Sequence, residues 1–101
     1  MEKRVYKNPR LGLYSNMPTV RREAGFAIEV HTRNEHGPAH VHVTKAGGEI
    51  RVKLGDDTTL PSYWDERAPM STRDKILAVR LVMTHQAECL AVWRKFNGNL
   101  W

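Results

Sequence analysis

The chain has 101 residues, a formal net charge of +5 and a single cysteine, Cys89. This length fits one domain, and a lone cysteine excludes an internal disulfide and is typical of the reducing cytoplasm. No apolar run reaches the length of a membrane-spanning helix, and the N-terminus lacks the apolar region of a signal peptide, so we expect a cytoplasmic protein without membrane contact. The excess of Lys and Arg favours an anionic partner, nucleic acid before an acidic protein.

Residues 1–16 are predicted to be a basic arm ahead of a single domain that spans residues 17–101. Pro9 and Gly12 disfavour a helix in the arm. Its charged residues are one acid and four cations: Glu2, Lys3, Arg4, Lys7 and Arg10. The arm is a frayed end, a segment that contacts phosphates, or a strand that pairs with a partner subunit.

Three segments of the domain alternate with the period of a β-strand. Residues 25–33, 39–46 and 49–54 each place every second side chain on an apolar face. The inward side chains are Phe26, Ile28, Val30, Val41, Val43, Ile50, Val52 and Leu54. Gly47-Gly48 predicts a two-residue hairpin turn between the second and third segments. An antiparallel sheet with one buried face follows.

The other face of this sheet gathers histidines and cations. The hairpin turn pairs His42 with Lys53, and a short first loop that keeps the apolar faces together pairs His31 with His42 and Glu29 with Thr44. We call this surface the histidine face. Its predicted members are Glu29, His31, Arg33, His40, His42, Thr44, Arg51 and Lys53.

The C-terminal half of the chain predicts a loop followed by a helix. Residues 55–57 form a turn, residues 58–60 add a short edge strand, and residues 62–70 form an ordered loop. Ser71 is a good N-cap with Asp74 three residues on, and one helix is expected from there to about Phe96. Its apolar arc should cover the sheet: Ala78, Val79, Val82, Met83, Cys89, Leu90, Trp93 and Phe96. The predicted fold class is α+β, with a three- to four-stranded antiparallel sheet and one long C-terminal helix packed on one face.

The segment from His36 to Val43 holds three of the five histidines. Gly37 and Pro38 predict a turn, after which His40 and His42 project from the same face of a strand. One interpretation is a metal site for zinc or another divalent transition ion. His40 and His42 would bind it, with His31 or Glu29 as third ligand and His36 at the turn as a fourth.

Two further interpretations of these histidines are open. In metal-free phosphate chemistry, the candidate catalytic residues are His40, His42 and His36. The cations Arg33, Arg51 and Lys53 would then hold the phosphate of an RNA substrate. In a structural role, His36 would hydrogen-bond the turn, and His40 and His42 would stack on Tyr63 or Trp64.

The chain resembles a family of small bacterial proteins known only as a domain of unknown function. The resemblance covers roughly residues 17–93. It rests on Met17-Pro18-Thr19-Val20, Gly25-Phe26-Ala27-Ile28, then His36, Pro38, His40 and His42, and finally His85 and Trp93. The sequence departs from the family's second proline at Ala39 and carries sixteen residues ahead of the Met-Pro-Thr start. The resemblance implies a setting in toxin–antitoxin-like gene pairs, and it adds His85 to the candidate binding residues. Without the resemblance, His85 is a boundary residue at the edge of the apolar arc.

From these observations we expect a basic cytoplasmic component of a toxin–antitoxin-like or mobile-element system. It would bind or cleave nucleic acid through the histidine face, with Arg33, Arg51, Lys53 and His85 in binding roles. The alternative is a non-enzymatic protein-binding module, an antitoxin or an inhibitor of a bacterial defence complex. Such a module would bind a small protein partner from an adjacent gene.

Overall fold

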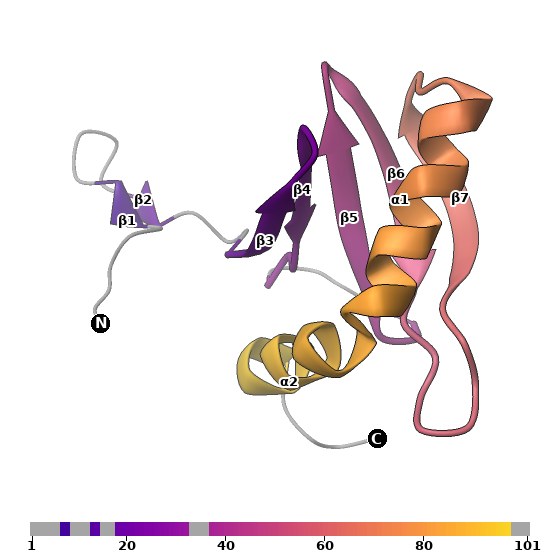
Figure 1. The fold of residues 1–101 in the computed structure, drawn as a ribbon. Helices are drawn as coiled ribbons and strands as arrows, with labels where there is room; N and C mark the ends of the chain where they lie inside the picture. The colour runs from indigo at the N-terminus through magenta and orange to yellow at the C-terminus, as the bar shows by residue number, and fades with distance from the viewer. Residues whose placement is uncertain (1–6, 9–12, 15–17, 33–36, 98–101) are drawn as a thin grey trace.

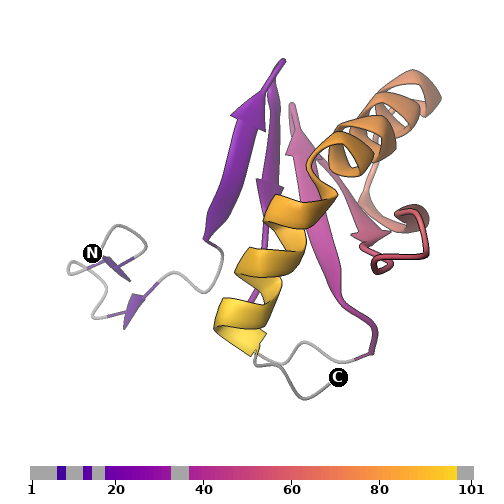
Figure 2. The same ribbon diagram turned by 60° about the horizontal axis from the view of Figure 1, so that its bottom comes forward.

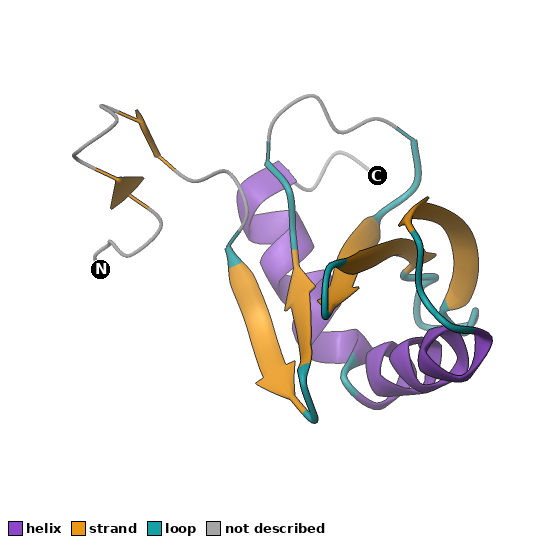
Figure 3. Ribbon diagram, turned by 90° about the horizontal axis from the view of Figure 1, so that it is seen from above, coloured by secondary structure: helices purple, strands orange, loops and turns teal. Residues whose placement is uncertain are grey.

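The computed structural model describes residues 7–8, 13–14, 18–32 and 37–97. Within these residues the fold is α+β, as predicted. Its main sheet contains β3 (Thr19–Glu23), β4 (Phe26–Glu29), β5 (His40–Lys45), β6 (Gly48–Lys53) and β7 (Ser62–Ala68). These five strands are antiparallel and pair in chain order. The helices α1 (Thr72–Thr84) and α2 (Gln86–Asn97) lie on one side of the sheet (Figures 1 and 3).

The sheet is larger than the three or four predicted strands because β3 and β7 do not show a clean alternation. β3 is a largely polar edge strand, and it joins β4 through a turn at Ala24-Gly25, whose φ angles are 53° and 85°. β7 occupies the predicted ordered loop, residues 62–70. Two register shifts against β6 break its period of two. The edge strand predicted at residues 58–60 is reduced to an isolated bridge between Asp56 and Thr59. In the arm, the described residues form a separate two-stranded pair, β1 (Lys7–Asn8) with β2 (Leu13–Tyr14).

The predicted hairpin turn is wrong by one residue. The turn lies at Ala46-Gly47, where φ is 50° and 87°, and Gly48 begins β6. Gly48 is a packing position, because a Cβ there would come within 2.5 Å of the Pro69 carbonyl oxygen. As a result His42 pairs with Arg51 instead of Lys53.

The first hairpin is also shifted by two residues from the predicted register. Glu29 lies opposite His42 instead of Thr44, and Ala27 lies opposite Thr44. A shift of two leaves every side chain on its predicted face, so the apolar pattern fits both registers equally well. The longer connection between Glu29 and His40 therefore could not be derived from alternation alone.

The predicted single helix is divided into two, with axes 79° apart. Ser71 caps α1 as predicted, because its hydroxyl accepts the Asp74 amide at 3.1 Å. His85 leaves helical geometry with φ −113° and ψ 25°. Just beyond it, the Gln86 side-chain amide lies 2.7, 3.0 and 2.8 Å from the carbonyl oxygens of Leu54, Asp56 and Thr59. This contact of Gln86 joins the helical layer to the β6–β7 connection. Beyond the break, α2 runs across the sheet (Figure 2).

The core lies between the helices and the apolar face of the sheet. It contains the predicted inward side chains of the sheet, with Met70, Ala78, Val82, Cys89, Leu90 and Trp93. Burial raises the pKa of the Cys89 thiol to about 12, so this side chain is a protonated filler of the core. Met83 was predicted to be in the core but is 40% exposed, since α1 buries Ala78 and Val82 instead.

Among the described residues, no single helix is long and apolar enough to cross a membrane. The bent pair α1 and α2 passes that test together, by length and composition only.

Candidate metal centre

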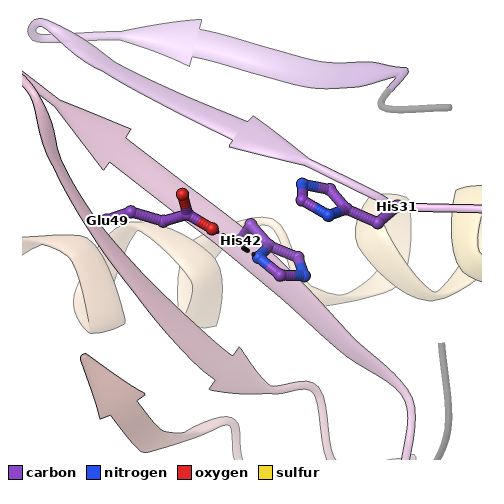
Figure 4. Close-up of side chains that lie close together, drawn as sticks. All are labelled: His31, His42 and Glu49. Carbon is purple, nitrogen blue, oxygen red and sulfur yellow. Dashed lines mark hydrogen bonds and ion pairs between the residues drawn. The ribbon is translucent and has the colours of Figure 1, made fainter. Parts of the chain in front are cut away.

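Three side chains of the histidine face form a compact cluster: His31, His42 and Glu49 (Figure 4). Each offers one ligand atom, and these atoms all lie within 4.8 Å of one another. The cluster projects from the face opposite the helices, which lie behind the strands in Figure 4. Among the described residues it is the only group of three His, Cys, Asp or Glu side chains with this spacing.

Strand pairing brings the three residues together. His42 lies in the middle of β5, opposite Glu29 on β4 and Arg51 on β6. His31 follows Glu29 by two residues, and Glu49 precedes Arg51 by two, so each lies diagonally across from His42 on the same face. The cluster therefore depends on the observed register of both hairpins.

Glu49 orients the ring of His42. The His42 Nδ1 lies 2.7 Å from a Glu49 carboxylate oxygen, and the His42 side chain is only 4% exposed. Because an ionised carboxylate only accepts hydrogen bonds, Nδ1 is the protonated nitrogen of this bond. In the neutral ring, the lone pair is then on Nε2. For this ring and the Glu49 carboxylate to bind one ion together, the Nδ1 proton has to leave, because ligand atoms bind metals in their deprotonated form.

His31 completes the cluster from the segment after β4. Its ring stacks on the His42 ring with centroids 3.4 Å apart and planes 1° apart. The His31 Nε2 is buried and has no hydrogen-bond partner among the described residues; the nearest carboxylate oxygen, on Glu29, is 3.9 Å away. A buried imidazole nitrogen without a hydrogen bond is costly to leave in place, so it is a candidate for an unseen ligand.

The donor set matches a transition ion. Two imidazoles and one carboxylate are the protein ligands of several catalytic zinc sites, where a fourth position stays open. The parallel rings cannot both aim their lone pairs at one ion, so binding requires one ring to rotate about its side-chain bonds. His31, two residues beyond the end of β4 and with a side chain 21% exposed, has more freedom to do so than His42.

A bidentate ion pair borders the cluster. The Arg51 guanidinium donates to both carboxylate oxygens of Asp65, through Nε at 2.7 Å and through Nη2. This pairing holds the pKa of the Asp65 carboxyl below its ordinary value of 3.8. The guanidinium carbon also lies 3.9 Å from the centroid of the Trp64 ring. Arg51 is thus fixed by a neighbouring strand and does not extend freely into solvent.

Glu49 and Asp65 are the members of this site that sequence reasoning missed. The alternation of residues 49–54 was enough to place Glu49 on the histidine face, since it precedes Arg51 by two residues on the same strand. Asp65 has no such signal, because its segment predicts a loop and the register shifts in β7 break the alternation that would assign its face.

His40 is not one of the three grouped ligands, although its ring centroid lies 5.3 Å from that of His42. It is 1% exposed, and its Nδ1 donates to the Pro38 carbonyl oxygen at 2.9 Å. Its ring meets Trp64 edge-on and lies 5.1 Å from Trp93 of α2. These contacts secure the start of β5 between the loop and the helical layer.

The remaining predicted residues do not join this cluster. His36 and Arg33 lie outside the described residues. Lys53 is exposed and its ammonium group is 5.6 Å from the centroid of the Trp64 ring. His85 lies at the break between the helices, where its Nε2 is 3.3 Å from a carboxylate oxygen of Glu23 on β3.

Comparison with protein families gives one match. A family model described as a domain of unknown function (DUF4160) matches residues 25–94. The comparisons with curated proteins and with solved structures returned no match.

Proposed function

The chain belongs to the DUF4160 family, and we propose that it binds a divalent transition-metal ion, preferably zinc, and uses it to cleave nucleic acid. The observation that carries this proposal is the cluster of His31, His42 and Glu49, with its ligand atoms within 4.8 Å of one another. The three residues would hold the ion, and solvent would occupy the fourth position.

Such an ion would supply an activated water at neutral pH and would polarise a phosphoryl oxygen. The residues of the chain have separate tasks around it. To share one ion with Glu49, His42 would give up its Nδ1 proton, so that the ion takes the place of the hydrogen bond between Nδ1 and the carboxylate. His31 would bind the same ion through a ring nitrogen. Arg51, held by Asp65, lies beside the cluster and would contact a non-bridging phosphate oxygen from the rim.

Charge favours the metal over metal-free phosphate chemistry. The described charged side chains in and beside the cluster are three cations, Arg51, Lys53 and Arg67, and three carboxylates, Glu29, Glu49 and Asp65, a formal sum of zero. That surface alone has no net attraction for a phosphodiester. An ion of charge +2 changes the sum to +2 and so makes the face attractive to phosphate.

Nucleic acid is the substrate class that the whole chain favours. Its formal net charge of +5 and sequence pI of about 9.7 give a long-range attraction to polyanions. We place this activity in the cytoplasm, in a toxin–antitoxin-like or mobile-element setting.

The test is cleavage of labelled single-stranded RNA and DNA by the full chain. Protein stripped with a chelator should be inactive, and added Zn²⁺ or Mn²⁺ should restore cleavage. His42→Ala should lower the metal-dependent rate by about 10²-fold or more, while His85→Ala, a histidine on the other side of the sheet, should not. Cleavage that persists in chelator, or that is equal in wild type and His42→Ala, would contradict the proposal.

A further inference from the structure

The outward face of α1 is apolar, although this helix has solvent on that side. Ile76, Leu77 and Met83 are 49%, 36% and 40% exposed. A groove of about 530 Å³ runs along one flank of the helix, between α1 and β7, and contains Tyr63, Thr72, Lys75, Ile76, Val79, Arg80 and Met83. A second, smaller groove runs along the other flank, and Arg80 and Leu77 line it. Exposed apolar side chains that gather around a groove are a feature of docking surfaces.

The charged groups around this surface that lack an ion-pair partner among the described residues are cations. No carboxylate lines either groove. The nearby acids are already paired: Asp74 lies 3.2 Å from Lys45, and Glu66 lies 3.0 Å from Lys75, which lines the larger groove. Among the described residues, no carboxylate pairs with Arg73 or Arg80. These two arginines are seven residues apart and so lie on one ridge of the helix, about 10.5 Å apart along its axis.

From this surface we propose that α1 docks an amphipathic helix of a partner protein with an acidic rim. Its apolar residues, at helical spacing, would enter the larger groove beside Ile76 and Met83. Its carboxylates, about two turns apart, would meet Arg73 and Arg80. A second copy of the chain fits poorly, because α1 against α1 would place these arginines against like charges. This surface is on the helical side, so the interaction is independent of the metal cluster.

The test uses a labelled synthetic helical peptide with leucines at positions i, i+3 and i+7 and glutamates flanking them. A matched peptide has lysine in place of each glutamate. Fluorescence anisotropy with the full chain should show binding of the glutamate peptide and not of the lysine peptide. Ile76→Glu and Arg80→Glu should each weaken binding by about tenfold or more, and Arg80→Glu should gain affinity for the lysine peptide. Arg94→Glu, an equal charge change on α2, is the matched control and should bind as the wild type does.

Four outcomes would overturn the proposal. The first is absence of binding of the glutamate peptide by the wild type. The second is equal affinity of wild type, Ile76→Glu and Arg80→Glu. The third is a dimer in sedimentation that Ile76→Glu abolishes, which would assign the surface to a second copy. The fourth is binding to phosphatidylglycerol vesicles that the same two variants abolish, which would assign it to a lipid surface.

Discussion

The imidazole of His31 lies flat on that of His42, with centroids 3.4 Å apart, although the two residues are eleven positions apart in the sequence. The stack joins the segment after β4 to the middle of β5. It also brings two nitrogen ligands to the carboxylate of Glu49. Neither histidine alone suggests a metal. The pair, with a carboxylate that already orients one ring, has the composition of a transition-ion site.

The ion pair beside the cluster predicts an acid-dependent loss of stability. The Arg51 guanidinium lowers the pKa of the folded Asp65 carboxyl below 3.8. When the pKa of a carboxyl is lower in the folded state than in the unfolded state, the ionised group stabilises the fold. This stabilisation is complete at a pH above the unfolded-state pKa and is lost as the pH falls through the folded-state pKa. The difference in unfolding free energy between wild type and Asp65→Asn should therefore be largest near pH 6 and shrink below about pH 4. Urea unfolding across this range measures it.

Asp57→Asn is the matched control for this prediction. It removes a carboxylate that makes no ion pair with a described cation, so its effect on stability should be smaller than that of Asp65→Asn at pH 6. A wild-type advantage over Asp65→Asn that grows on acidification would contradict the linkage.

How far the sequence determines this fold depends on the element. The inward residues of β4, β5 and β6 were predicted correctly, because alternation reports the face directly. The registers were not, because a shift of two residues keeps every side chain on its face, and because Ala46-Gly47 and Gly47-Gly48 are both acceptable turns. The close packing of Gly48 against Pro69 favours the first turn. His31 and His42 were predicted to lie close together and do so in spite of the register error, since a shift of two residues preserves the face.

Nothing in the sequence around His85 predicts the break between the helices. No proline or glycine lies between Ser71 and Asn97, and the apolar spacing continues through His85. The break is stabilised by a tertiary contact, the amide of Gln86 on the carbonyls of the β6–β7 connection. The same limit applies to the site. Alternation places His40 and His42 on one face, but the contacts of His40 with Pro38 and the two tryptophans, which decide its role, come from distant parts of the chain.

This explanation of the break predicts the behaviour of Gln86 variants. Gln86→Ala removes the donor to three carbonyl oxygens and should lower the free energy of unfolding by about 1–3 kcal/mol. Gln86→Glu should cost more, because a carboxylate oxygen would then face those carbonyls. Denaturant unfolding measures both. Ala87→Glu, which adds the same charge at the next, exposed position, is the control. Equal stability of Gln86→Glu and Ala87→Glu would show that the contact does not hold the break.

The measurement that tests the central claim most directly is calorimetric titration of Zn²⁺ into the metal-free full chain. The cluster predicts one ion per chain. His31→Ala and His42→Ala should abolish this binding, and Glu49→Gln should weaken it by about tenfold or more. His85→Ala should bind the ion as the wild type does, since its ring lies at the helix break. A wild type that takes up no Zn²⁺, or a His42→Ala variant that binds it with unchanged affinity, would contradict a metal centre on this sheet.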